Sequence, residues 1–220
     1  MLKSLFFKEW LKIKWTFLSL SAISILAILY IFLNVSHGIE INSPVNFWAF
    51  VIYKKYPFAS DLVYLPFIIG LVIAIVQFYP EINSGRLKLT LHLPMKENKI
   101  LISMVLIAGG LLLMLFCLNL LLFDIISNSF FPYEITNSNL MVLIPSYIAG
   151  MIGYFATATV MVEPVWSRRI PQIIFFGGLI SILFDVGDFT TRLLLFYIII
   201  GSFTVLTILL SGFYYKRGIK

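Results

Sequence analysis

The stretch YPEINSGRLKLTLHLPMKENKI, residues 79–100, is the long polar segment between two strongly apolar runs, residues 62–78 and 100–123. A helix needs about 20 mostly apolar residues to cross the hydrocarbon core of a bilayer, so the runs on both sides predict membrane spans. The segment between them is basic because it carries Arg86, Lys88, Lys96 and Lys99. Since lysine and arginine are enriched in cytoplasmic loops, we expect this segment to face the cytoplasm and to dock onto another protein there.

Local sequence predicts some structure inside this segment. Glu81 follows Pro80 and is expected near the N-terminal end of a short helix, where the helix dipole favours a carboxylate. Pro94 is expected to end the structure that precedes it, because proline has no backbone N–H to donate. Residues 80–99 are therefore predicted to form a partly structured loop.

The composition is that of an integral membrane protein. Of the 220 residues, 60% are hydrophobic and 12% are charged, and the mean hydropathy is +1.00, whereas soluble domains are about half apolar and about a quarter charged. The net charge is +6, but the basic residues cluster at the ends of apolar runs, which favours membrane orientation over nucleic-acid binding. The lone Cys117 excludes an internal disulfide and a cysteine metal cluster.

The apolar runs predict an all-α fold, a polytopic transmembrane helical bundle with six spans in one domain, residues 15–220. The expected spans cover residues 15–34, 62–79, 100–123, 140–162, 171–184 and 193–214. The fifth span is short and contains Gly177-Gly178, so a full crossing and a re-entrant helix both remain open. Outside loops are expected at residues 35–60, which are rich in aromatic side chains suited to the outer interface, at 124–139 and at 185–191.

The distribution of basic residues predicts the orientation. With the N-terminus inside and six crossings, 13 of the 16 lysine and arginine residues fall on the cytoplasmic side. We therefore expect a multi-pass protein of the plasma membrane (the inner membrane of a bacterium) with both termini in the cytoplasm.

Residues 1–14 precede the first span and mix lysines with aromatic side chains. On a helix, one stripe would hold Ser4, Lys8 and Lys12, and the roughly opposite side would hold Phe6, Trp10 and Ile13. This pattern predicts an N-terminal interfacial amphipathic helix that lies in the headgroup region. A simple helical extension of the first span, carrying cytoplasmic positive charge, is the alternative.

The sequence lacks the usual signs of chemistry within the chain. No acidic or basic residue lies in the middle of a predicted span, which disfavours carriers driven by protons or sodium. Gln77 and Asn119 are the most polar groups within the spans and are expected to hydrogen-bond between helices. There is no phosphate-binding loop and no protease motif, and His37 and His92 are isolated. We expect no catalytic residue, no metal site and no cofactor in this chain.

One loop pattern and the overall layout point to a known family. The loop at residues 80–99 matches that family's pattern at Glu81, Gly85, Arg86, Leu89, Leu93, Pro94, Lys96 and Lys99. With an N-terminal interfacial helix and six spans whose ends are both inside, the chain resembles the membrane subunit of ABC exporters of the type-2 permease class. The resemblance covers nearly the whole chain, which is at the short end for the family.

The resemblance implies a mechanism and partners. The loop at 80–99 would be a coupling helix seated in a cleft of a separate nucleotide-binding ATPase subunit, which would bind ATP and magnesium. Glu81 and Arg86 would make polar contacts with that ATPase, and Leu89 and Leu93 would anchor it. Two permease chains, identical or related, would enclose the pathway in contact with membrane lipid.

The sequence also offers a second possible contact with the ATPase and two alternative functions. Glu163, Arg168 and Arg169 form a possible second ATPase contact, although the two arginines also suit anionic lipid headgroups. The alternative function is a non-transporting scaffold or assembly protein that recruits a cytoplasmic partner through the same loop. A lipid-acting enzyme would need a cluster such as Asp185 and Asp188. The sequence does not indicate the transported substrate.

Overall fold

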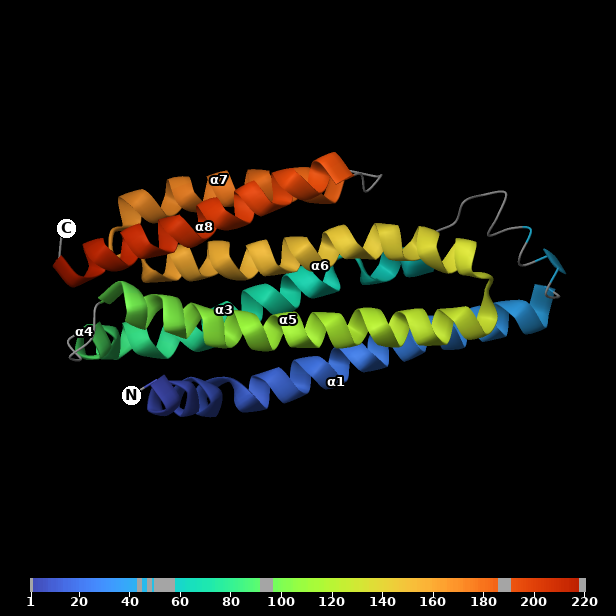
Figure 1. The fold of residues 1–220 in the computed structure, drawn as a ribbon, viewed down its shortest axis with the longest axis horizontal. Helices are drawn as coiled ribbons and strands as arrows, with labels where there is room; N and C mark the ends of the chain where they lie inside the picture. The colour runs from blue at the N-terminus through green and yellow to red at the C-terminus, as the bar shows by residue number, and fades with distance from the viewer. Residues whose placement is uncertain are drawn as a thin grey trace.

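The computed structural model describes residues 2–42, 45–46, 49, 58–91, 97–185 and 191–217, and this part of the chain contains helices and no strand. The elements are α1 (Leu2–Asn42), the 3-10 helix η1 (Phe58–Leu62), α3 (Leu65–Asn83), α4 (Arg86–Leu91), α5 (Glu97–Phe130), α6 (Tyr133–Val162), α7 (Trp166–Asp185) and α8 (Thr191–Arg217). Figure 1 shows the long helices side by side in an elongated bundle. The start of α1, the end of α8 and α4 lie at the same end, which we call the α4 end.

Four helical stretches in the described part of the chain are long and apolar enough to cross a membrane. They are Lys3–Ile41, Phe58–Asn83, Lys99–Phe130 and Tyr133–Val162. A shorter apolar stretch, Ile199–Tyr215, lies in α8. The predicted fifth span corresponds to α7, which is helical through Pro171 but is not among the four. The prediction of an all-helical, membrane-embedded bundle is therefore confirmed at this level.

The helices continue past the apolar runs at the end opposite α4. Residues 124–139 were expected to be a loop, but α5 extends to Phe130 and α6 begins at Tyr133. The hydroxyls of Ser127 and Thr136 lie 3.0 Å apart and join the two helices beside the turn. A helix satisfies its own backbone hydrogen bonds in water as well as in lipid, so the end of an apolar run does not mark the end of a helix.

Contact between α3 and α6 forms the centre of the bundle, where α6 also packs against α5, α7 and α8. Gly70 of α3 faces Gly150 of α6 so closely that a Cβ at Gly70 would overlap the carbonyl oxygen of Gly150. A Cβ at Gly150 would lie 2.6 Å from the carbonyl oxygen of Pro66. These backbones touch because neither helix has a side chain at the crossing, which is a common packing mode in membranes.

Phenylalanine rings fill the end of the bundle opposite α4. Five rings from α1, η1, α5 and the following turn have centroid separations of 5.0 to 6.0 Å; they belong to Phe32, Phe58, Phe123, Phe130 and Phe131. Among the aromatic residues of 35–60, which were expected to lie partly in the outer interface, Phe58 is 6% exposed and packs inside the bundle. Its ring is buried because the neighbouring helices supply an apolar cluster for it. The other aromatic residues of that loop lie outside the described residues.

Candidate functional site

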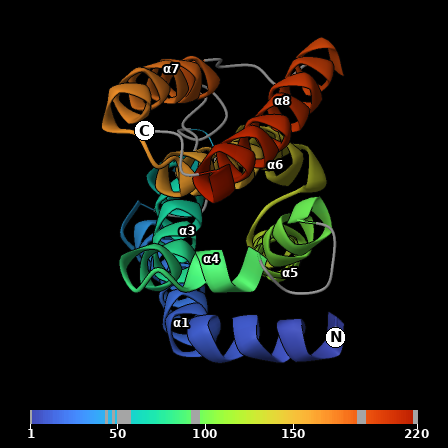
Figure 2. The same ribbon diagram turned by 90° about the vertical axis from the view of Figure 1, so that its left-hand side faces the viewer.

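Two helical segments lie across the α4 end. Figure 2 looks along the bundle from this end and shows α4 running between α3 and α5, with the first turns of α1 crossing the view beside it. The helix α1 is continuous from Leu2 to Asn42, yet its first turns run across the direction of the rest (Figures 1 and 2). We call residues 2–14 the N-terminal arm. The arm and α4 together form a layer over the ends of the long helices.

The N-terminal arm has one side buried against the bundle. Leu5, Glu9 and Ile13 follow at helical spacing and are 8%, 0% and 0% exposed, respectively. Phe7 and Leu11, on the other side of the same helix, are exposed. A carboxylate at the centre of a buried stripe is costly unless it is paired and hydrogen-bonded, so the partners of Glu9 explain how the arm is held.

An ion cluster of four residues joins the arm to α3. The Nζ atom of Lys8 lies 2.9 Å from Oε1 of Glu81, and Nζ of Lys12 lies 3.1 Å from the same oxygen. Lys12 also lies 2.7 Å from Oε1 of Glu9. Glu9 and Glu81 are buried, whereas Lys8 is partly exposed. Two carboxylates and two ammonium groups balance, so the cluster buries no net charge. We call Lys8, Glu9, Lys12 and Glu81 the ion cluster.

Gln77 extends this network toward the middle of the bundle. Its Nε2 donates to Oε2 of Glu9 and to the carbonyl oxygen of Met104, both at 2.9 Å. The hydroxyl of Tyr154 donates to Oε1 of Gln77 at 2.7 Å. The prediction that Gln77 hydrogen-bonds between helices is confirmed, and its bonds connect the arm, α3, α5 and α6.

α4 is fixed to the same network on one side and exposed on the other. Lys8 donates to the hydroxyl of Thr90 at 3.0 Å, and Leu87 is fully buried. Arg86 and Leu89 are exposed, Leu89 by 71%. α4 therefore offers a basic and apolar surface at the end of the bundle while its other side is tied to the arm.

The structure separates the residues predicted for the coupling loop. Glu81 is not at the start of a helix but in the last turn of α3, buried and paired within the chain, so no surface of its carboxylate is left for a partner. Arg86 and Leu89 are accessible on α4. Leu93, Pro94 and Lys96 lie outside the described residues. Sequence reasoning missed Lys8 and Lys12 as the partners of Glu81, and it missed Glu9 as the second carboxylate bound to Lys12; the acidic Glu9 within a basic segment was the available signal.

Gly85 makes the turn between α3 and α4. Its φ of +66° lies in the left-handed region, which costs other residues about 1–2 kcal/mol, and less for asparagine. Its N–H donates to the carbonyl oxygen of Ile82 at 3.1 Å. The glycine thus lets the chain turn from the bundle direction into the layer.

Gly85→Ala is expected to lower stability by about 1 kcal/mol through the backbone alone, because a Cβ at Gly85 meets no atom within 4 Å. In thermal denaturation in detergent this corresponds to about 2–4 °C. Gly85→Asn should lose less. Gly177→Ala, at a helical glycine that also has open space, is the control and should lose nothing. Equal stability of Gly85→Ala and the wild type would contradict the left-handed backbone conformation of Gly85 in this turn.

The predicted second contact also has an internal role. Glu163 is 1% exposed and accepts a hydrogen bond from the Ser211 hydroxyl of α8 at 2.9 Å. Its carbonyl oxygen accepts from Nε of Arg169 at 2.6 Å. The guanidinium group of Arg168 lies 4.5 Å from the centre of the Tyr214 ring. These contacts join α6, α7 and α8, and Arg168 is the exposed member of the predicted set.

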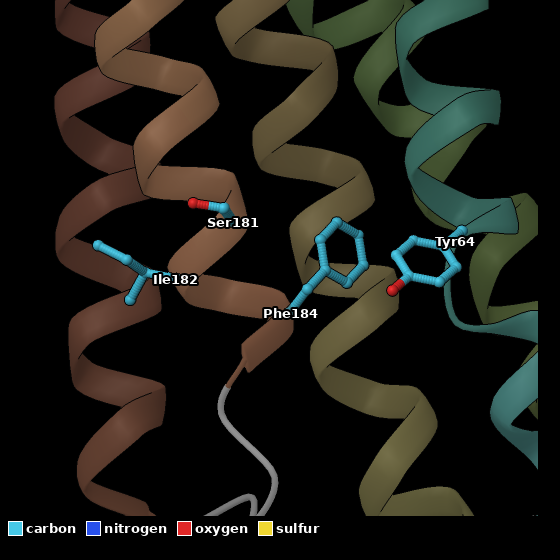
Figure 3. A pocket seen from close by; sticks show the side chains of 4 residues that line it. All are labelled: Tyr64, Ser181, Ile182 and Phe184. Carbon is cyan, nitrogen blue, oxygen red and sulfur yellow. The ribbon is translucent and has the colours of Figure 1, made fainter.

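A cavity of about 480 Å³ lies at the other end of the bundle, between α3 and α7. It is lined by Tyr64, Ser181, Ile182 and Phe184, and Figure 3 shows the Phe184 ring turned toward Tyr64. The described lining residues include no histidine, lysine, arginine, aspartate or glutamate. In the described part of the chain, no three histidine, cysteine or acidic residues lie together as metal ligands.

Comparisons of the chain with models of protein families, with curated proteins and with solved structures gave no match. Function is therefore argued from the layer at the α4 end, from the ion cluster beneath it and from the surface that α4 leaves exposed.

Proposed function

We propose that this chain is the membrane subunit of an ATP-driven ABC exporter and that α4 is the helix through which a separate ATPase acts on it. One observation carries the proposal: α4 lies across the end of the bundle with Arg86 and Leu89 exposed, while Thr90 and Leu87 hold its other side to the arm and the bundle. A helix that only closed a loop would not need the ion cluster beneath it.

The topology that we propose has six spans with both termini and α4 in the cytoplasm. In addition to the four candidate spans, α7 and α8 run along the bundle in opposite directions (Figure 1), and each packs against α6. The start of α1 and the end of α8 lie at the α4 end, as an even number of crossings requires. Basic residues gather at this end, including Lys3, Lys14, Arg86 and Arg168, and this distribution supports a cytoplasmic location.

The proposed mechanism is mechanical. The partner ATPase would bind ATP and magnesium, and closure of that subunit would displace α4. A ligand shifts a conformational equilibrium only when it contacts the two states differently, so the exposed side of α4 is where the free energy of ATP binding would enter. Because the ion cluster ties α4 and α3 to the arm, the displacement would move all three together. The translocation pathway would lie between two permease chains, identical or related.

The test uses the full-length chain purified from its native membrane in mild detergent. We expect a nucleotide-binding ATPase subunit to co-elute and to hydrolyse ATP in the presence of magnesium. Arg86→Glu with Leu89→Glu should weaken its retention at least about tenfold, since truncating a few central contacts commonly costs 2 kcal/mol or more.

The matched control for this experiment is Arg86→Lys with Leu89→Met, which keeps the charge and the apolar character and should retain the ATPase. A purified assembly with a stable partner but without ATP hydrolysis would favour the scaffold function instead. If Arg86→Glu with Leu89→Glu retained the ATPase as well as the wild type does, α4 would not be the docking helix.

A further inference from the structure

The four lysines of the N-terminal arm fall into two sets. Lys8 and Lys12 belong to the ion cluster, where Glu9 and Glu81 neutralise them. No ion pair joins Lys3 or Lys14 to an acidic residue in the described part of the chain. The positive charge that remains on the arm is therefore that of Lys3 and Lys14.

These two lysines share a side of the helix with large apolar residues. Lys3, Phe7, Leu11 and Lys14 recur at the three- and four-residue spacing of one helical face, opposite the buried Leu5, Glu9 and Ile13. Phe7 and Leu11 are 62% and 45% exposed, and the neighbouring Trp15 is 74% exposed. In water this face would expose a row of apolar side chains, so it needs an apolar environment with negative charge at its edge.

The position of the arm matches such an environment. In Figure 2 the arm lies along the outer edge of the bundle, beyond the rest of α1, α4 and α5. Its unburied side therefore faces away from the other helices. The arm is the first part of the apolar stretch Lys3–Ile41, and it crosses the bundle near the ends of the other three candidate spans. A helix at this depth with an apolar face and flanking lysines sits at the boundary of headgroups and acyl chains.

We propose that this outward face of the arm, formed by Lys3, Phe7, Leu11 and Lys14, is a binding surface for anionic phospholipid. The two ammonium groups contact the phosphate-bearing headgroups, and Phe7 and Leu11 enter the acyl boundary. A basic residue near an anionic bilayer surface contributes about 1 kcal/mol, which corresponds to about a fivefold preference for each lysine. The proposal does not depend on an ATPase partner.

Tryptophan fluorescence provides the test, because Trp10 lies on the arm and Trp15 directly follows it. The full chain with Trp48→Phe and Trp166→Phe is reconstituted into phosphatidylcholine vesicles that contain brominated phosphatidylglycerol or, at the same mole fraction, brominated phosphatidylcholine. We expect the anionic quencher to be enriched at the arm by about tenfold or more at low salt, and the enrichment should fall as the salt concentration rises.

Lys3→Gln with Lys14→Gln should bring the two quenchers to nearly equal efficiency. The control Arg168→Gln removes a basic residue from the same end of the bundle on α7 and should leave the preference unchanged. Equal quenching in the wild-type background, or a preference that survives the double glutamine variant, would overturn the proposal. Weak quenching by both lipids would also overturn it, since the face would then be covered by protein.

Discussion

Gly70→Val is expected to prevent the bundle from assembling. A Cβ at Gly70 would overlap the carbonyl oxygen of Gly150, and this oxygen belongs to a helical backbone that cannot turn aside as a side chain does. Overpacking of a core commonly costs 1–3 kcal/mol when side chains adjust. With backbone against backbone, α3 and α6 must separate, and we expect a loss of at least about 3 kcal/mol.

The measurement is the fraction of monodisperse protein that survives heating, followed by size-exclusion chromatography in detergent. Gly150→Val should behave in the same way, because its Cβ would lie 2.6 Å from the carbonyl oxygen of Pro66. Gly110→Ala is the matched control: its Cβ meets nothing within 4 Å, and replacing a helical glycine by alanine is neutral or stabilising. Wild-type behaviour of Gly70→Val would show that the two helices do not cross at these glycines.

Glu81→Ala is expected to release the N-terminal arm. Without this carboxylate, Lys8 loses its acidic partner and Lys12 keeps only Glu9. Removing one member of a buried ion pair commonly costs 3–5 kcal/mol. Lys8 has 39% of its side chain exposed and can be solvated by water, so we expect a loss near the lower limit, about 3 kcal/mol.

Labelling of a single cysteine with a membrane-impermeant maleimide reports this release. In a Cys117→Ala background, Ile13→Cys is expected to be protected, because Ile13 is fully buried, and to react once Glu81→Ala is added. Phe7→Cys, at an exposed position, should react in both backgrounds. Glu40→Ala removes a carboxylate at the other end of α1 and should leave Ile13→Cys protected. Continued protection in Glu81→Ala would mean that the cluster does not hold the arm.

The helices were predictable because hydrocarbon demands long apolar runs, and each predicted span overlaps a helix of the structure. The boundaries were less predictable. An apolar run indicates only the part of a helix that lies within the membrane, whereas α5 and α6 continue to within a few residues of each other. The close contact of Gly70 with Gly150 was also beyond the sequence, because hydropathy does not indicate which residues of two helices meet.

The coupling role of residues 80–99 stays a prediction, whereas the predicted position of Glu81 at the start of a helix is wrong. The sequence placed this carboxylate at a helix start, where the dipole favours it, but it lies in the last turn of α3, where the dipole opposes it by about 0.3–1 kcal/mol. Lys8 and Lys12 compensate from a segment about 70 residues away in the chain. Such pairing depends on how distant helices pack, and helical periodicity within one segment does not report it.

The ion cluster has a consequence for biosynthesis. The ribosome releases Lys8 and Lys12 long before Glu81, so both ammonium groups are still unmatched by α3 when the first helix enters the bilayer. In the proposed orientation they would then act as a cytoplasmic retention signal and help to set the direction of the first crossing. After insertion of α3, the carboxylate of Glu81 would pair with the same two groups, and only an α3 of the matching orientation could bring it there.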